Sequence, residues 1–542
     1  MAVAAALTIV AILSTRLSHR FGVPALVLFV GIGMFAGSSG PLGIQFNDIE
    51  LSYHVGTIAL ALILFYGGLD TRMTMFKAAI VPASVLATVG TVLTMLFVGL
   101  SAYALTSLDL LTSMLLGAVV SSTDAAATFS MLKGRGLPKR LRGTLETESG
   151  TNDPAAVLLT YSLAEAITRG GAVNYLALVG DIVLELALGV ALGVAFGWLL
   201  KRLINKAALG NIGLYPMLAL SGALLAFALT GLLHGNGYMA IYLVGLILSH
   251  NRLSHRLAIV NFMDGTAWGA QLVMFLLMGL LVNPDQLPAI IGVALLITAA
   301  CMLIARPVAV GVSLWLVRMV TRGRIAFGIR EQLLITWAGL KGAVPIILAM
   351  VPLLDRVPGA DDIFNVVFVV VIVGTLLQGF TISPLAKALG LSKDEPPPAL
   401  LRLELGGDAP DGAAVVDVYL AEDNRAIGKR IDELSLPPSV VIAAVLRGKQ
   451  MVTPRGSTVF RNGDHVYLIG SRMHTESIPT AFGRKWHGVG ASPRTANAGA
   501  DPQSVHSTSA ELGSAGPFPD GGSGSAFPGG AEGHDGSGSS LG

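Results

Sequence analysis

The sequence predicts an all-α polytopic membrane protein of about 13 transmembrane helices, followed by a small cytoplasmic α+β domain. Three observations lead to this fold class. First, 53% of the 542 residues are apolar and only 13% are charged, whereas a soluble domain carries about 25% charged residues. Second, apolar segments fill the chain to about residue 389. Third, Lys and Arg gather in alternate loops. The composition excludes an ordinary soluble enzyme, and a net charge of +2 gives no field suited to nucleic acid.

The predicted membrane segments follow one another with short loops between them. A spanning helix needs roughly 20 apolar residues. The segments are expected at residues 1–14, 22–39, 53–69, 78–104, 109–132, 143–167, 175–200, 211–232, 236–250, 263–282, 287–316, 331–353 and 361–389. The first is short for a span. It lacks the basic start and small-residue cleavage site of a signal peptide, so it is interpreted as part of the structure.

The loops give an independent test of this count. Loops after odd-numbered segments hold 18 Lys and Arg residues, whereas those after even-numbered segments hold only Arg169 and Arg356. Cytoplasmic loops of membrane proteins are enriched in these residues. We therefore expect the N-terminus outside and the C-terminus in the cytoplasm.

The composition changes beyond residue 390. Residues 1–390 form the membrane domain, 391–402 are expected to be a linker, and 403–472 contain strand-like runs at 413–420, 440–446 and 459–469. Residues 483–542 are rich in Gly, Ser and Pro, and are predicted to be disordered. The one cysteine, Cys301, cannot form an internal disulfide and is expected in the core.

Charged residues inside the predicted segments are the candidate functional groups, because charge in a bilayer is costly. In segment 5, Thr123 and Asp124 stand near the middle, after two serines. Such residues favour helix breaks and caps over helix interiors. Transporters use helices broken near the midplane, where free backbone groups line an ion site. Capping of a buried half-helix is the simpler alternative, and it is compatible with ion binding.

Segment 6 places two carboxylates at different angles. Glu148 and Asp153 are five residues apart, which turns a helix by about 140°, whereas Ser149 and Asp153 share a face. We expect Ser149 and Asp153 to face the substrate and Glu148 to face a structural or gating partner. Pro154 removes one backbone donor from this helix.

Two basic residues are candidate partners for these acids. Lys341 stands between Gly339 and Gly342 in segment 12, and its expected partner is Glu148. Arg306 is placed nearer a cytoplasmic helix end, where snorkelling or a structural pairing is expected.

Several catalytic motifs are absent from the sequence. It contains no G-x-x-x-x-G-K-[ST] and no G-x-G-x-x-G, so neither ATP-driven transport nor a dinucleotide site is indicated. We expect no bound cofactor and no enzymatic activity.

Three motifs carry a family resemblance: S-T-D-A-A-A-x-F in segment 5, E-S-G-T-N-D-P in segment 6 and G-L-K-G-A-V-P in segment 12. With them the chain resembles the monovalent cation/proton antiporters of the CPA1 family, most closely its bacterial potassium/proton members. The resemblance implies inverted repeats, two crossing discontinuous helices, a homodimer and a bacterial inner-membrane location in contact with lipid.

The resemblance also implies roles for individual residues. Asp153 would bind the cation and the proton alternately, and Ser149 would add an oxygen ligand. Asn152 would belong to the same ion-binding set, and it stands where electrogenic relatives have a second Asp, which favours electroneutral exchange. Thr123 and Asp124 would belong to the crossing of the two broken helices. The partner in that crossing is expected in segment 13, near Thr375 and Gln378.

The sequence departs from the family pattern at two positions. Lys341 stands where the family usually has Arg, and a lysine offers a point charge instead of a planar fork. Tyr66 stands where relatives often carry an acid.

The C-terminal region resembles the RCK_C (TrkA-C) module through motifs such as Asn462-Gly463-Asp464. The matching Rossmann half is absent. The resemblance therefore implies a small anionic or nucleotide ligand between paired modules, and no NAD switch is expected.

These observations favour exchange of a monovalent cation for H⁺. An ionised carboxylate at Asp153 is costly in an apolar site, so a proton or a cation must neutralise it, and the two compete. The sequence does not separate K⁺ from Na⁺. A gated channel or uniporter would show conductance without proton coupling, and a membrane sensor would show no flux.

Overall fold

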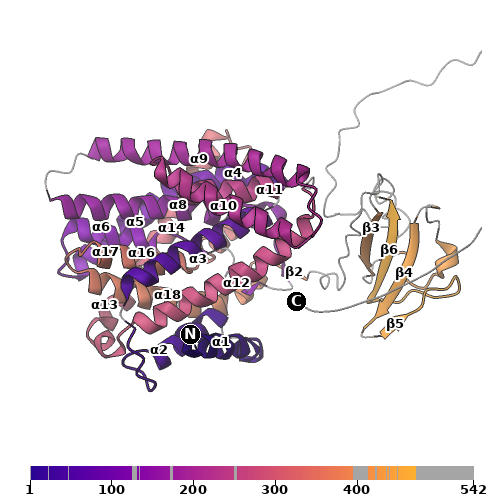
Figure 1. The fold of residues 1–542 in the computed structure, drawn as a ribbon, viewed down its shortest axis with the longest axis horizontal. Helices are drawn as coiled ribbons and strands as arrows, with labels where there is room; N and C mark the ends of the chain where they lie inside the picture. Colours follow the sequence, from indigo (N-terminus) through magenta and orange to yellow (C-terminus); the bar gives the residue numbers. More distant parts are fainter. Residues whose placement is uncertain are drawn as a thin grey trace, which may run out of the picture. The chain divides into compact units, whose positions relative to one another are not determined.

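The structure is a computed structural model. It describes residues 2–471 except 22–23, 47, 72, 125–127, 129–130, 133–134, 171–174, 250–252, 395–412, 421–423, 435, 437, 439 and 449. The predicted tail at 483–542 and most of the predicted linker lie outside the described residues. The described part consists of a large helical domain and a small β-sheet domain, drawn in Figure 1.

Helices make up most of the first half of the membrane domain, as far as the structure describes it. They are α1 (Ala2–Phe21), α2 (Ala25–Ala36), α3 (Ile49–Asp70), α4 (Met73–Val85), α5 (Thr91–Leu105), α6 (Leu110–Val120), α8 (Lys139–Arg169) and α9 (Tyr175–Lys206). A π-helical turn, Leu86–Gly90, joins α4 to α5. Asp48 and Asp109 cap α3 and α6 by accepting hydrogen bonds from backbone N–H groups of the first turn.

The second half continues in the same way. It contains α10 (Leu214–Leu232), α11 (Gly237–Leu248), α12 (Arg256–Leu281), α13 (Leu287–Ala300), α14 (Arg306–Val320), α15 (Ile329–Trp337), α16 (Val344–Leu348), α17 (Met350–Leu354) and α18 (Ala360–Ala388). A short 3₁₀ turn, Pro284–Gln286, precedes α13, and a second π-helical turn, Cys301–Ala305, joins α13 to α14. Cys301 is buried, as predicted.

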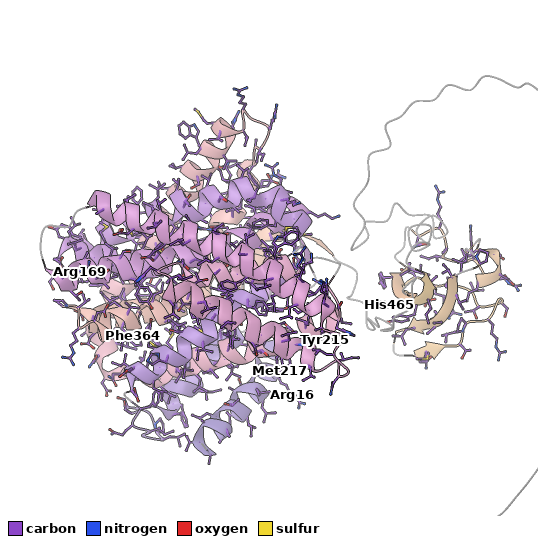
Figure 2. The ribbon with its side chains drawn as sticks, turned by 45° about the horizontal axis from the view of Figure 1, so that its top comes forward. Arg16, Arg169, Tyr215, Met217, Phe364 and His465 are labelled. Atoms are coloured by element: carbon purple, nitrogen blue, oxygen red, sulfur yellow. The ribbon has the colours of Figure 1, made fainter. Side chains whose placement is uncertain are left out.

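By length and composition, seven described helices are apolar enough to cross a membrane, and five shorter apolar helices accompany them. Each of the thirteen predicted segments coincides with a helix or with an interrupted helix. Figure 2 shows Arg169 and Phe364 at one end of the helical domain, and Arg16 and Tyr215 at the opposite end. This separation agrees with the predicted alternation of the loops.

The helices pack as two groups. One group contains α1, α2, α3, α9, α10, α11 and α12, and the other contains α4, α5, α6, α8 and α13 to α18. Contacts within each group are extensive. Between the groups they are sparse and are made mainly by α8, α16, α17 and α18 against α2, α3, α9, α11 and α12.

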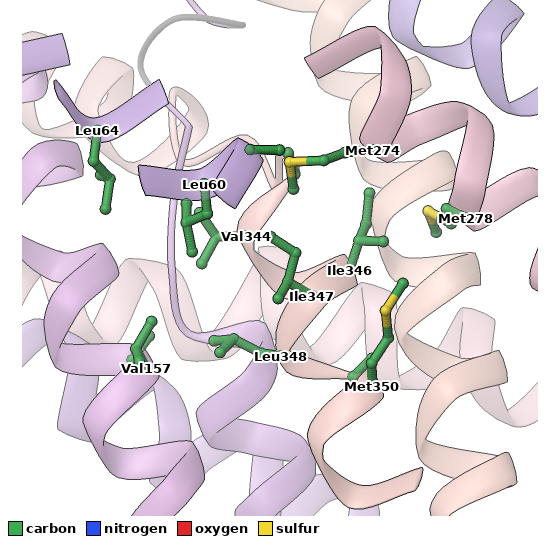
Figure 3. Packing of buried hydrophobic residues seen from close by; sticks show 14 of the residues in the cluster. Leu60, Leu64, Val157, Met274, Met278, Val344, Ile346, Ile347, Leu348 and Met350 are labelled. Carbon is green, nitrogen blue, oxygen red and sulfur yellow. The ribbon is translucent and has the colours of Figure 1, made fainter. Parts of the chain in front are cut away.

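The boundary between the groups is apolar where α16 crosses it. In Figure 3, Val344 and Ile347 of α16 lie near Leu60 of α3 and Met274 of α12. A boundary built of alkyl and thioether side chains holds few directional bonds. Apolar packing, which is non-directional, therefore holds the two groups together where α16 crosses the boundary.

The C-terminal domain is a four-stranded antiparallel sheet in the order β3-β6-β4-β5. Its strands are β3 (Ala413–Tyr419), β4 (Val440–Arg447), β5 (Gln450–Val452) and β6 (Asp464–Ser471). Apart from a 3₁₀ turn at Ile431–Glu433, its described residues contain no helix, so the α+β expectation is corrected to a β-sheet domain. The third predicted strand begins later than expected, at Asp464, because the turn at Gly463 (φ 87°) precedes it.

A two-stranded ribbon completes the described structure. β1 (Arg135–Gly136) pairs antiparallel with β2 (Lys393–Asp394), which follows α18. It joins the loop before α8 to the chain that leads on to the C-terminal domain.

Candidate ion-binding site

Two helix breaks meet in the second helical group. α6 ends at Val120, and the chain is not helical from Thr123 to Asp124; α15 ends at Trp337, and helix resumes at Val344. The Asp124 N–H donates to the Leu340 carbonyl at 2.8 Å. The Thr128 hydroxyl donates to the Ala338 carbonyl at 2.9 Å. Backbone groups that the breaks set free therefore satisfy one another across the junction.

This arrangement corrects the predicted crossing partner. The expected partner was segment 13, but α18 is continuous from Ala360 to Ala388, and the interrupted partner is segment 12. Thr375 and Gln378 lie beside the junction on α18, where the Thr375 hydroxyl donates to the Lys341 carbonyl at 3.1 Å.

Glycine is required where the two breaks touch. A Cβ atom on Gly342 would collide with the Asp124 side chain, and one on Gly339 would collide with the Arg306 guanidinium. The missing side chains of Gly342 and Gly339 thus leave room for Asp124 on one side of Lys341 and for Arg306 on the other.

Helix α8 holds Thr123 in place from the side. The Ser149 hydroxyl donates to the Thr123 carbonyl at 2.8 Å. The Asn152 amide donates to the Thr123 hydroxyl at 2.7 Å. Both residues were predicted to bind the ion, and the structure gives each a bond to the helix break as well.

Asp153 lies where this assembly meets the other helical group. Its side chain is buried, with 6% exposed, and its Oδ1 has no hydrogen-bond partner among the described residues. At about 100° per residue, Ser149 and Asn152 lie on one side of Asp153 around α8, and Gly150 and Tyr161 on the other. Asp153 is therefore oriented along the boundary between the two groups.

The other side of α8 contacts α3 and α11. The Tyr242 ring of α11 packs against Gly150, where no Cβ would fit. Asn236, the cap of α11, donates its side-chain amide to the Pro154 carbonyl at 3.1 Å. Further along α8, the Tyr161 hydroxyl bonds to the Tyr53 hydroxyl of α3. These contacts lie on both sides of Asp153 along the helix.

The buried ion pair of the site differs from the predicted one. Glu148 pairs with Arg306 at 2.6 Å, with side-chain exposures of 1% and 5%. The predicted pairing of Glu148 with Lys341 was wrong. The structural pairing that was one of the two expectations for Arg306 is confirmed, and Arg306 does not snorkel to the surface.

Lys341 caps the first broken helix instead. Its ammonium group donates to the Ser122 carbonyl at 3.0 Å, just beyond the C-terminus of α6. A cation at a helix C-terminus is favoured by the free carbonyls and the helix dipole. Lys341 is nevertheless close enough to act electrostatically on Asp153, as are Asp124 and Glu148.

Sequence reasoning missed the residues of α3 and α11 at this boundary, Tyr53, Asn236 and Tyr242. Their side chains are uncharged, so a search for intramembrane charge passes over them. It also missed Asp264 of α12, which faces Tyr66 of α3. An acid eight residues into a membrane helix was a signal that could have found this contact.

Two broken helices joined beside a buried, unbonded carboxylate, at a sparse boundary between two helical groups, define a membrane transporter of the secondary type. The chain belongs to the sodium/hydrogen exchanger family: residues 5–388 match its transmembrane domain, described as "Sodium/hydrogen exchanger, transmembrane". Residues 415–479 match the TrkA-C domain.

Individual relatives agree with this assignment. The chain is 40% identical over 484 residues to the K(+)/H(+) antiporter NhaP2 of Shewanella oneidensis, covering 89% of this chain and 82% of the relative. It is 37% identical to the K(+)/H(+) antiporter NhaP of Alkalimonas amylolytica, covering 88% and 82%. The solved structure of the sodium proton antiporter MjNhaP1 from Methanocaldococcus jannaschii shares the fold, with a TM-score of 0.62 at 22% identity, covering 71% of this chain and 97% of that one.

Proposed function

We propose that this protein exchanges K⁺ for H⁺ across a bacterial inner membrane and so serves cation, pH and cell volume homeostasis. The observation that carries the proposal is Asp153, a buried carboxylate with a free oxygen at the boundary between two helical groups. Two relatives carry the name K(+)/H(+) antiporter, and these names support K⁺ over Na⁺ as the cation proposed for this chain.

The charges around Asp153 support a one-for-one exchange. Three carboxylates, Asp124, Glu148 and Asp153, face two basic groups, Arg306 and Lys341. With all five ionised, the cluster carries one uncompensated negative charge. One proton or one monovalent cation neutralises it, so each half-cycle carries the same charge and the exchange is electroneutral.

The ligands of the cation come from the groups that surround this acid. Asp153 would supply a carboxylate oxygen, and the Ser149 and Thr123 hydroxyls would add two more oxygens. Ser149 would keep its bond to the Thr123 carbonyl, and the Thr123 hydroxyl would keep its bond from the Asn152 amide. Asn152 would hold Thr123 and contribute no charge. Glu148 and Arg306 would fix the helices that carry the site.

Two matching helix series support an inverted repeat. Residues 73–169 form a helix with a π-helical turn, an interrupted helix and a long helix; residues 284–388 repeat that order. We propose thirteen crossings, with the two interrupted helices crossing near the midplane and the N-terminus outside. The first helical group would be the fixed part and the second the moving part, in a homodimer.

The TrkA-C-matching region would regulate transport from the cytoplasm. We propose that it binds a small anionic or nucleotide ligand, as the resemblance implies, and that this ligand changes the rate of exchange.

Proton flux in proteoliposomes tests the proposal. The full chain is reconstituted with an internal pH dye, the membrane potential is clamped, and K⁺ or Na⁺ is added. We expect K⁺-dependent proton movement that Asp153→Asn abolishes and that the matched exposed variant Asp285→Asn leaves intact. Flux that survives in Asp153→Asn would overturn the site. K⁺ conductance without proton movement would identify a channel or uniporter instead.

A further inference from the structure

A cavity lies beside Lys341, between the second helix break and α18. Thr298, Arg306, Lys341 and Gln378 are among the residues that line it, and each of the four is at most 4% exposed. The space that the centre of a water molecule can occupy in this cavity is about 10 Å³. This is close to the lower limit for holding one water molecule. The cavity therefore has room for one molecule or ion of about the size of water.

The polar groups around this cavity have bonding capacity left over. Arg306 Nε and Gln378 Oε1 have no hydrogen-bond partner among the described residues. Lys341 Nζ donates to the Ser122 carbonyl, and its ammonium group has two further hydrogens. The Thr298 hydroxyl donates to the Ala294 carbonyl and keeps lone pairs that accept. Two residues with donors and two with acceptors thus line one cavity.

We propose that this cavity binds one water molecule, and that Gln378 positions Lys341 through it. The water would accept from Arg306 and Lys341 and donate to Gln378 and Thr298, which completes its four bonds. A metal cation is excluded by the two positive groups. A halide would use the donors but would leave Gln378 Oε1 and Thr298 without a hydrogen to accept.

The bound water would connect the two buried cations of the site. Through Arg306 it would link the Glu148 ion pair to Lys341, whose charge acts on Asp153 together with Asp124 and Glu148. Gln378 would then be a positioning residue that never touches the transported ion. Its effect on transport rests on the proposed function, whereas the water itself does not.

The experiment compares wild type, Gln378→Met and the control Gln271→Met in the full chain. Gln271 is the other buried glutamine among the described residues, and it lies on α12 in the other helical group. Methionine keeps the length and removes the acceptor. A structure that resolves waters, determined with and without bromide, is combined with proton flux measured across pH.

We expect one density peak between Arg306, Lys341 and Gln378 in wild type and in Gln271→Met, with no anomalous bromide signal, and no peak in Gln378→Met. Exchange in Gln378→Met should fall about tenfold, roughly 1.4 kcal/mol. Its half-maximal pH should also differ from that of wild type, because a less firmly held Lys341 changes the electrostatic field at the site.

An empty cavity or a bromide signal in wild type would overturn the water site, whatever the transport result. A pH profile in Gln378→Met equal to that of wild type would overturn the positioning role. Absence of exchange in wild type would count against the proposed function while the density still decides the water site.

Discussion

Glu148 Oε1 lies 2.6 Å from Arg306 Nη2, and both side chains are shielded from solvent. The pair joins α8 to the turn of chain where the π-helical turn Cys301–Ala305 gives way to α14. A buried pair of this kind contributes little when it replaces two apolar groups, but losing one partner strands a charge.

The first prediction follows from that asymmetry. Glu148→Leu and Arg306→Leu should each destabilise the protein by about 3–5 kcal/mol, because the remaining charge is unpaired. Glu148→Leu with Arg306→Leu should cost clearly less than the two single leucine variants together. Thermal unfolding of the purified variants measures this. Single-variant losses that simply add would show that the two groups do not interact.

A second prediction concerns Asn152. Asn152→Asp adds a second negative charge beside Asp153, so the charge count that supports electroneutral exchange no longer holds. We expect its exchange rate to become sensitive to membrane potential, whereas Asn152→Ala should slow exchange without that sensitivity, since Thr123 loses its amide donor. Flux at several clamped potentials distinguishes the two, and an Asn152→Asp variant indifferent to potential would contradict the charge count.

The third prediction uses the contact between the helix breaks. Gly342→Ala should reduce exchange by more than tenfold, because a methyl group there occupies the space of the Asp124 side chain. Gly311→Ala is the matched control, since no heavy atom lies within 4 Å of the added carbon. Proton flux per reconstituted protein is the measurement. Equal activity in both variants would mean that the junction tolerates separation.

A fourth prediction concerns the hydroxyl pair between Tyr53 and Tyr161, which bridges the two helical groups. Tyr161→Phe removes the bridge and keeps the ring, so the boundary should open more often on that side of Asp153. In a Cys301→Ser background, Val157→Cys should react several-fold faster with an impermeant thiol reagent added outside. Tyr103→Phe, at an exposed position, is the control. An unchanged rate would show that this pair does not restrict access.

The fifth prediction concerns the β-sheet domain. Arg447 bonds to Asp464 through two nitrogens, and these hydrogen bonds raise the pKa of Arg447. Asp464 is fully buried. Arg447→Met should therefore strand this carboxylate and make residues 413–471 markedly more sensitive to limited proteolysis in the full chain. Arg455→Met, at an exposed turn, should not.

The positions of the membrane helices could be predicted from the sequence because apolar length and loop charge are local properties. The search for polar residues inside apolar segments, where contact with lipid is costly, likewise found Thr123, Asp124 and Asp153. Which helix faces meet is a different matter. The π-helical turn Cys301–Ala305 widens the helix just before Arg306 and shifts the face on which Arg306 emerges. The sequence therefore did not show that Arg306, and not Lys341, faces Glu148.

The crossing partner failed for a related reason. The expectation of a break in segment 13 came from the family resemblance, yet Gly379 lies inside a continuous helix, where a side chain would collide with Pro24. Those in segment 12 flank a real break, next to Pro345. Glycine allows both close packing and interruption, so its presence alone does not decide between them.

The ribbon formed by Arg135–Gly136 and Lys393–Asp394 ties together two stretches of chain that lie far apart in the sequence. One of its strands belongs to the loop between the first broken helix and α8; the other continues into the chain that carries the β-sheet domain. Backbone hydrogen bonds resist stretching far better than a free loop does. A force applied at Asp394 would therefore be transmitted to the N-terminal end of α8, the helix that carries Asp153.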